Sequence, residues 1–284
     1  MHLPFEGMPG TLILCATPIG NLGDLSERAA EVLSHADVIF AEDTRRTAKL
    51  LHHIGVSVPM KSFYAHNEQS RLVELVECLD RGESVVLVSD AGMPVVSDPG
   101  SSAVDAAVDA GATVTVVPGP SAVVAALAVS GFDGDRFVFE GFLPRKGADR
   151  RAVIESIAGE ERTVVFFAAP GRVARDLEQL AESVGRERRV VLARELTKLY
   201  EETWRGSIVD AAAHWGSVEA SKGEFTVVLE GAMREVPDMG AATVAVKHLI
   251  DQGSTTSDAV RQIATSTGVS RRELYGIIIN DLQR

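Results

Sequence analysis

The sequence predicts an α/β protein whose first part is built on a parallel-rich, doubly wound sheet. Short apolar runs alternate with segments of helical apolar spacing, as expected for strands joined by crossover helices. The runs at 12–16, 38–41, 85–88 and 113–117 are too short for helices, and their continuous hydrophobicity is typical of strands buried on both faces. With 284 residues, the chain is long enough for two domains of ordinary size.

The stretch 85–100, VVLVSDAGMPVVSDPG, is the one around which the chain is organised. Its strand stops at Ser89-Asp90, and the turn Ala91-Gly92-Met93-Pro94 follows. Ligands of open α/β sheets bind at the carboxyl ends of strands, and small residues there let a ligand reach the backbone. The Asp90 carboxylate suits hydroxyl groups or a cation, although a turn in which it only caps backbone N–H groups is an equal alternative.

Two further strand-to-helix loops carry the same small, proline- and glycine-containing chemistry. The first, 17–23, precedes Asp24 and Glu27, whose spacing predicts a capping box. The second, 118–122, places Ser121 where it would cap a small-residue helix that starts at Ala122. No GxGxxG or Walker A pattern occurs, so a dinucleotide Rossmann site and a P-loop are both disfavoured.

Polar side chains gather after the second strand and before a later helix. The run 42–46 reads EDTRR, which fits either a helix start or a functional cluster at a strand end. The run 64–68 reads YAHNE, in which polar neighbours could orient the tautomer of His66. We expect a short helix over 47–54 and another over 71–79.

A composition shift near Gly131 separates an N-terminal α/β domain at 10–130 from a second one at 131–232. The second domain should hold strands at 137–140, 163–167, 190–193 and 225–229 and a helix at 173–183. Its loop GFLPRK, from Gly141 to Lys146, is aromatic and then basic, which suits a nucleobase and a phosphate but also fits a core aromatic beside surface charge.

The last part, 238–284, predicts a helical module. A helix at 243–250 precedes a helix, a turn with Gly268 and a further helix, which is the helix-turn-helix pattern. Arg271 and Arg272 would stand at the start of the last helix, where such modules contact nucleic acid. A helical hairpin packed on the main body is at least as good an interpretation.

Net charge, apolar runs and cysteine positions limit the binding partners and the cellular compartment that we expect for this protein. A net charge of −12 argues against a nonspecific, charge-driven nucleic-acid binder, although RNA remains open as a substrate. We find no long apolar run, no secretory signal and no metal-ligand spacing. Cys15 and Cys78 stand far apart in apolar patterns, which suggests structural thiols in a reducing compartment. We therefore expect a cytoplasmic protein that binds no metal and no membrane.

Eight short motifs follow one another along the chain. They are TPIGNL at 17–22 with Asp24, AEDTR at 41–45, HNE at 66–68, VSDAG at 88–92, DPG at 98–100, PGPSA at 118–122, EGFLP at 140–144 and ARELTK at 193–198. In this order they resemble the ribosomal RNA small subunit methyltransferase I family, which has the tetrapyrrole methylase fold. The resemblance runs from about Gly10 to Ala232, and the tail is similar to a helical domain often appended to that family. One departure is Met93, where the family usually has threonine.

The resemblance implies a homodimeric enzyme that uses S-adenosylmethionine to methylate the 2′-hydroxyl of a cytidine in the decoding region of 16S rRNA within the small ribosomal subunit. By the family pattern, the cofactor lies in a cleft between the two α/β domains. The residues implied for the cofactor are Pro18, Ile19, Asp90, Ala91, Gly92, Met93, Ser121, Ala122, Phe167, Glu195 and Glu230.

Methyl transfer from a sulfonium is mostly a matter of positioning, but the attacking hydroxyl must lose its proton. Candidates for the base or for an orienting group are His66, Asp43, Glu68 and Lys198, with Glu195 also open. For contacts to RNA we name Arg45, Arg145, Lys146, Arg271 and Arg272. Two alternatives remain, a tetrapyrrole methyltransferase of the same fold and a nonenzymatic ribosome-assembly factor.

Overall fold

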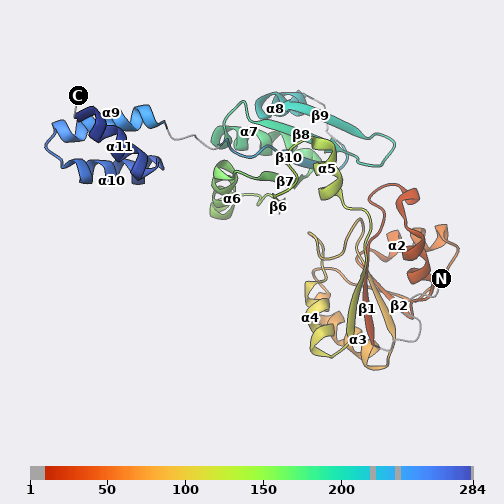
Figure 1. Cartoon of the computed structure of the whole chain (residues 1–284). Coiled ribbons are helices and arrows are strands. Elements are labelled where there is room, and N and C mark those ends of the chain that lie inside the picture. The colour runs from red at the N-terminus through yellow and green to blue at the C-terminus, as the bar shows by residue number, and fades with distance from the viewer. Residues whose placement is uncertain (1–9, 218–221, 234–237, 283–284) are drawn as a thin grey trace. The chain divides into compact units, whose positions relative to one another are not determined.

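A computed structural model describes residues 10–217, 222–233 and 238–282. The chain forms two compact units, Met1–Ala232 and Met233–Arg284. The first unit contains two sheets, and the second contains helices (Figure 1). None of the helices within the described residues is long and apolar enough to cross a membrane.

The first sheet is fully parallel, in the order β3-β2-β4-β1-β5, as the buried apolar runs predict. Apolar side chains of α1 and α2 cover one face, and those of α3 and α4 cover the other, which makes the sheet doubly wound. The elements are β1 (Thr11–Cys15), α1 (Glu27–Ser34), β2 (Val38–Ala41), α2 (Thr44–His53), β3 (Met60–Ser62), α3 (Glu68–Asp80), β4 (Ser84–Val88), α4 (Ser101–Asp109) and β5 (Thr113–Val117).

The second sheet is mixed, in the order β6-β7-β10-β8-β9. Among the described residues of this sheet, β6 and β7 pair in parallel, whereas β10 is antiparallel to both β7 and β8, and β8 is antiparallel to β9. Helices α6, α7 and α8 pack on one face. The elements are β6 (Phe137–Phe142), α6 (Gly147–Gly159), β7 (Thr163–Ala168), the 3-10 turn η2 (Pro170–Arg172), α7 (Val173–Val184), β8 (Arg189–Arg194), β9 (Glu202–Ser207), α8 (Ile208–Ser217) and β10 (Phe225–Leu229).

Helix α5 (Ala122–Ser130) covers the other face of the second sheet, although it follows directly after the first. Its residues Val123, Ala126 and Leu127 pack with Val165 of β7 and Val228 of β10. The helix lies within the predicted N-terminal domain 10–130, yet its apolar side chains complete the core of the second sheet. The division of this unit into two domains, at 10–130 and 131–232, therefore stays a prediction made from the sequence.

Two predicted helix caps differ from the observed ones. Helix α1 begins after Ser26, whose hydroxyl accepts a hydrogen bond from Ala29 N–H, so the capping box predicted at Asp24 is wrong. Asp24 belongs instead to the 3-10 turn η1 (Leu22–Asp24). Ser121 occupies the N-cap position of α5 but makes no side-chain capping bond, which leaves its hydroxyl available to a ligand.

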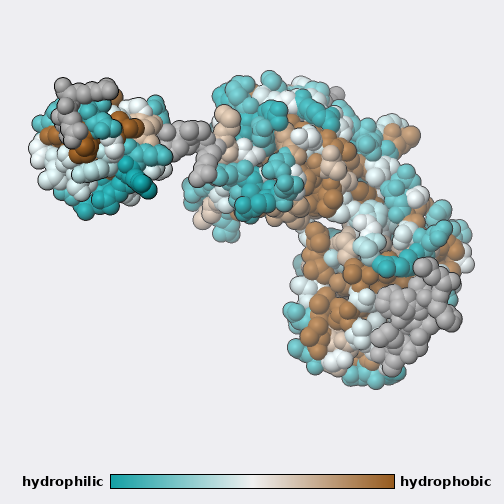
Figure 2. All heavy atoms as spheres, in the orientation of Figure 1, coloured by the Kyte–Doolittle hydropathy of each residue, from teal (hydrophilic) through white to brown (hydrophobic). Residues whose placement is uncertain are grey.

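The second unit consists of α9 (Met239–Asp251), α10 (Thr256–Thr267) and α11 (Arg271–Leu282) around its own apolar core. Gly268 is left-handed at the end of α10, as the predicted turn requires. Arg271 and Arg272 are exposed at the start of α11. In the view of Figure 2 the surface of this unit is mostly hydrophilic. The predicted helix, glycine turn and helix are confirmed for the residues up to 282, and residues 283–284 lie outside the described ones.

Candidate functional site

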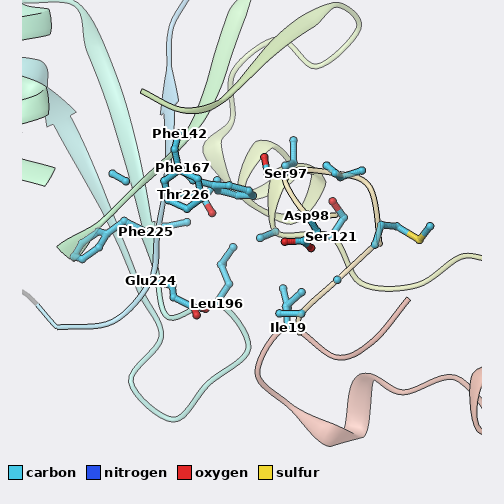
Figure 3. Close-up of a pocket in the computed structure, with 18 of the residues that line it drawn as sticks. Ile19, Ser97, Asp98, Ser121, Phe142, Phe167, Leu196, Glu224, Phe225 and Thr226 are labelled. Atoms are coloured by element: carbon cyan, nitrogen blue, oxygen red, sulfur yellow. The ribbon is translucent and has the colours of Figure 1, made fainter. Parts of the chain in front are cut away.

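A pocket of about 360 Å³ opens among the loops of the first unit (Figure 3). Residues after β1 and β4 and at the start of α5 form one part of its wall. The ends of β6 and β7, the end of β8 with the loop after it, and the start of β10 form the rest. Seven of the residues implied for a cofactor line it. They are Ile19, Ala91, Gly92, Met93, Ser121, Ala122 and Phe167.

The loops after β1 and β4 are tied to each other at this pocket. Thr17 N–H donates to the Gly92 carbonyl at 2.9 Å, and Gly92 N–H donates to the Thr17 carbonyl at 3.0 Å. The Thr17 hydroxyl also donates to the Ser89 carbonyl at 3.2 Å. Gly92 has a φ of +86°, which favours glycine. The two loops therefore form one pocket wall at the carboxyl edge of the first sheet, where the sequence predicts it.

Four residues in two loops at the pocket have an unusual backbone. Among the described residues, the non-glycine residues with positive φ are Val95 at +76°, Ser97 at +65°, Glu195 at +52° and Thr197 at +66°. Such conformations cost free energy and persist only where the surrounding structure holds them, and they cluster at functional sites. Their gathering beside the pocket supports a binding role for both loops.

The pocket is apolar on one side and carries a few polar groups on the other. Figure 3 places Phe142 and Phe167 across from Asp98 and Ser121. The two phenyl rings lie with their centroids 5.3 Å apart, and the Phe142 side is open to solvent, with 60% of that residue exposed. Apolar walls with a few placed polar groups are typical of small-molecule sites.

Carboxylates gather behind the Asp90 turn. Asp90 N–H donates to Glu42 Oε2 at 3.1 Å, and Asp90 Oδ1 accepts from Asp43 N–H at 3.0 Å. Arg46 Nε lies 3.5 Å from Asp90 Oδ2. Asp90 thus joins the loop after β4 to the start of α2, and it borders the pocket without lining it. This agrees with the interpretation in which its carboxylate caps backbone N–H groups.

Burial is the main influence on the pKa values of two carboxylic acids near this turn, Glu42 and Asp98. It raises the pKa of Glu42 above its usual range. It also raises the pKa of Asp98 to about 6, with repulsion from Glu42 adding to the effect and a hydrogen bond from Ser89 opposing it. Asp98 lines the pocket but was not singled out from the sequence as a site residue. The other lining residues missed in that way include Val96, Ser97, Phe142, Leu196 and Glu224.

Two predicted catalytic candidates are held in local contacts. The Asp43 carboxylate accepts from Arg45 Nε at 2.9 Å and from its NH2 group at 2.6 Å. Hydrogen bonding from Arg45 holds the pKa of Asp43 well below its usual range. Glu68 accepts from the Ser102 hydroxyl. Of the residues that the structure describes, those lining the pocket include neither Asp43 nor Glu68.

The other two candidates, His66 and Lys198, also lie outside the described lining of the pocket. His66 is exposed, with its ring centroid 6.4 Å from that of Tyr64. Lys198 Nζ donates to Glu195 Oε1 at 2.9 Å and to Glu224 Oε2 at 2.8 Å. Burial alone would lower the pKa of Lys198, but these two hydrogen bonds outweigh it and raise the pKa. Lys198 is therefore a cation that stays protonated.

Three further residues implied for the cofactor are not among the described residues that line the pocket. Pro18 and Glu195 border it, and Glu230 lies far from it. Pro18 precedes the lining residue Ile19, and Glu195 is bound to Lys198 and to the backbone N–H of Glu224. The lining residue Thr226 lies near the start of β10, whereas Glu230 follows the end of that strand. There Glu230 forms an ion pair with Arg189 at 2.9 Å. Because β10 runs antiparallel to β7, its carboxyl end points away from the pocket.

The predicted RNA contacts divide between the two units. Arg145 and Lys146 are exposed on a loop whose backbone is held by a hydrogen bond from a buried arginine. The Pro144 carbonyl accepts from Arg150 NH1 at 2.9 Å, and buried Arg150 pairs with Asp176 at 2.9 Å. Arg45 is exposed but bound to Asp43, and Arg271 and Arg272 belong to the second unit.

Comparison with known proteins gives a family for this fold and site. The family model for Tetrapyrrole (Corrin/Porphyrin) Methylases matches residues 11–212. A ribosomal RNA small subunit methyltransferase I from Synechocystis sp. is 44% identical over 269 residues, with 94% of this chain and 96% of the relative covered. The protein of that name from Thermotoga maritima is 46% identical over 222 residues, covering 78% of this chain and 99% of its own length.

Solved structures share the fold at low sequence identity. A cobalt precorrin-4 methyltransferase aligns with a TM-score of 0.61 at 15% identity, covering 78% of this chain and 95% of its own. A uroporphyrin-III C-methyl transferase from Thermus thermophilus, complexed with S-adenyl homocysteine, aligns with a TM-score of 0.55 at 18% identity, covering 77% and 96%. The chain therefore belongs to the tetrapyrrole methylases and, among them, to the ribosomal RNA small subunit methyltransferase I family.

Proposed function

We propose that this protein uses S-adenosylmethionine to methylate the 2′-hydroxyl of a cytidine in the decoding region of 16S rRNA. Family membership supports the coarser statement that it is a methyltransferase acting on rRNA. The 2′-hydroxyl of a cytidine is the finer expectation from the motifs. We further propose a homodimer that acts on the small ribosomal subunit in the cytoplasm.

The observation that carries the proposal is the fit between the pocket and the methyl donor. An aromatic and aliphatic wall with Phe167 and Ile19 suits an adenine ring, and Ala91, Gly92 and Ala122 let a ligand come close to the backbone. A methyltransferase of the same fold was solved with S-adenyl homocysteine. When bound, the cofactor would supply an electrophilic methyl group.

The chain's own contribution to the reaction is mostly placement. The joined loops around Thr17 and Gly92 and the two strained loops give the pocket a fixed shape before a ligand enters. A fixed site spares the reactants much of the entropy of finding an in-line arrangement.

Sequence identity favours rRNA over a tetrapyrrole as the substrate. Relatives named ribosomal RNA small subunit methyltransferase I match this chain at 44% and 46% identity over most of its length. The solved cobalt precorrin-4 and uroporphyrin-III methyltransferases are only 15% and 18% identical to it. We therefore retain the tetrapyrrole methyltransferase only as an arm of the test.

The test is methyl incorporation from labelled S-adenosylmethionine into purified small subunits that lack the modification. We expect label in 16S rRNA, recovered as 2′-O-methylcytidine on nucleoside analysis. The matched control is Ala122→Trp, which fills the pocket and should abolish both cofactor binding and incorporation. Incorporation into a tetrapyrrole alone would support the first alternative. Cofactor binding without transfer to any substrate would support the assembly factor.

A further inference from the structure

Transfer of a methyl group to a hydroxyl requires a proton acceptor near the hydroxyl. Such a group must reach the reacting atoms, so it must line the pocket. Among the described residues that line the pocket, only Asp98 and Glu224 have titratable side chains. None of the four candidates predicted from the sequence is among them.

Glu224 is a poor base because it is already bound to a cation. Its Oε2 atom accepts from Lys198 Nζ at 2.8 Å, and 68% of its side chain is exposed to solvent. The Glu224 carboxylate is therefore already engaged by Lys198 and by solvent, so it is not free to accept a hydrogen bond from a substrate hydroxyl group.

Asp98 has the opposite surroundings. It is partly buried on the loop between the strained residue Ser97 and helix α4, and it faces the carboxylates of Glu42 and Asp90. The nearby cation Arg46 pairs with Asp90, and no ion pair to Asp98 is found among the described residues. Repulsion and burial both favour taking up a proton, and the pKa of about 6 suits a base at neutral pH.

We propose that Asp98 is the general base that removes the proton from the attacking hydroxyl group. The inference rests on the proposed methyl transfer and adds the residue that accepts the proton released by the attacking hydroxyl group. As the new O–CH₃ bond forms, the S–CH₃ bond breaks and its electron pair stays on sulfur. The hydroxyl O–H bond breaks at the same time, and its proton moves to the Asp98 carboxylate.

The first experiment compares Asp98→Asn with the wild type in single-turnover methyl transfer to small subunits, at saturating cofactor and substrate. Asparagine keeps the size of the side chain but cannot accept the proton, so we expect the rate to fall by at least about 100-fold. The dissociation constant for S-adenosylmethionine, measured by calorimetry, should change by less than about threefold, or ~0.6 kcal/mol. The matched control is Asp105→Asn, an exposed carboxylate on α4.

The second experiment follows the proton itself without turnover. In the protein labelled with ¹³C at the aspartate carboxyl, one resonance absent from Asp98→Asn should titrate near pH 6. The wild-type single-turnover rate should fall about tenfold per pH unit below that point, because only the ionised carboxylate can act. Repulsion from Glu42 and from Asp90 raises the pKa of Asp98, so substitution of either residue should move this midpoint.

Three outcomes would overturn the inference. Transfer by Asp98→Asn within about fivefold of the wild type would show that the proton goes elsewhere. A large loss of cofactor affinity with an unchanged rate at saturation would make Asp98 a cofactor ligand. A wild type that binds cofactor but methylates no rRNA would remove the proposed function and this inference together, whereas the first two outcomes leave the proposed function in place.

Discussion

The methylene chain of Lys198 lies so close to Gly20 that a Cβ atom on Gly20 would fall 2.4 Å from Lys198 Cγ. Gly20 belongs to the loop after β1, whereas Lys198 follows β8. The Lys198 ammonium group then binds Glu195 and Glu224. Because Leu196 and Glu224 line the pocket, this contact links the first sheet's loop to the wall formed by the second.

Gly20→Ala should weaken cofactor binding. The added methyl group must push the Lys198 chain aside, and overpacking of this kind costs about 1 kcal/mol, which is roughly a fivefold rise in the dissociation constant. Calorimetry with S-adenosylmethionine measures it. In a chain that also carries Lys198→Ala, the same substitution should cost nothing. Gly159→Ala, where the added Cβ meets no atom within 4 Å, is the matched control.

Asp176→Ala should strongly destabilise the protein. Asp176 pairs with Arg150, and their side chains are 6% and 7% exposed, so its removal leaves a buried guanidinium without its anion. We expect a loss of about 3–5 kcal/mol in the free energy of unfolding by urea. Glu202→Ala removes a more exposed partner of Arg194 and should cost less than about 1 kcal/mol. Equal losses in the two variants would contradict this account of the buried pair.

Asp98→Asn should stabilise the folded protein at neutral pH while removing activity. The pKa of this carboxyl is about 6 in the fold and 3.8 ordinarily, so its ionisation opposes folding at any pH above 6. The gain should approach about 3 kcal/mol at pH 7–8, because each unit of pKa difference is worth about 1.4 kcal/mol. It should disappear as the pH falls from 6 toward 3.8, where the wild type regains its stability. Urea unfolding across this range measures the gain, and Asp105→Asn, at an exposed position on α4, is the matched control.

A chain that ends at Ala232 should keep the cofactor site and lose affinity for the small subunit. Helices α9 to α11 have their own core, and a family member from Thermotoga maritima matches only 78% of this chain over 99% of its own length. We expect cofactor affinity within about threefold and subunit binding weakened by about tenfold or more. The full chain with Arg271→Ala and Arg272→Ala should show a smaller loss and a weaker salt dependence. Equal losses of both affinities would rule out a docking role.

The first sheet and its ligand-binding edge could be predicted from sequence because parallel strands leave a strong local signal. The runs that became β1, β2, β4 and β5 are continuous and rich in β-branched residues. Strands β3 and β9 were missed because MKS and ETWRGS are polar edge strands without such a run. Helices α6 and α8 were missed as well.

Pairing direction and long-range contacts could not be predicted in this way. Glu230 follows a strand, as the other expected ligands do, but nothing local shows that β10 runs antiparallel to β7. Asp98 reads as part of a Ser-Asp-Pro-Gly turn. Only the fold brings it to the pocket and sets it against Glu42, which is far away in the sequence.

Helix α5 makes the two sheets depend on each other during folding. It is the covering layer for Val165, Val191 and Val228, yet it reaches them through the chain that leaves β5. A fragment beginning at Gly131 would leave that face of its sheet bare to water and prone to aggregate. During synthesis, α5 emerges before any strand of the sheet that it covers. The segment 1–130 must therefore carry an unburied apolar helix until β10, the last strand, has joined.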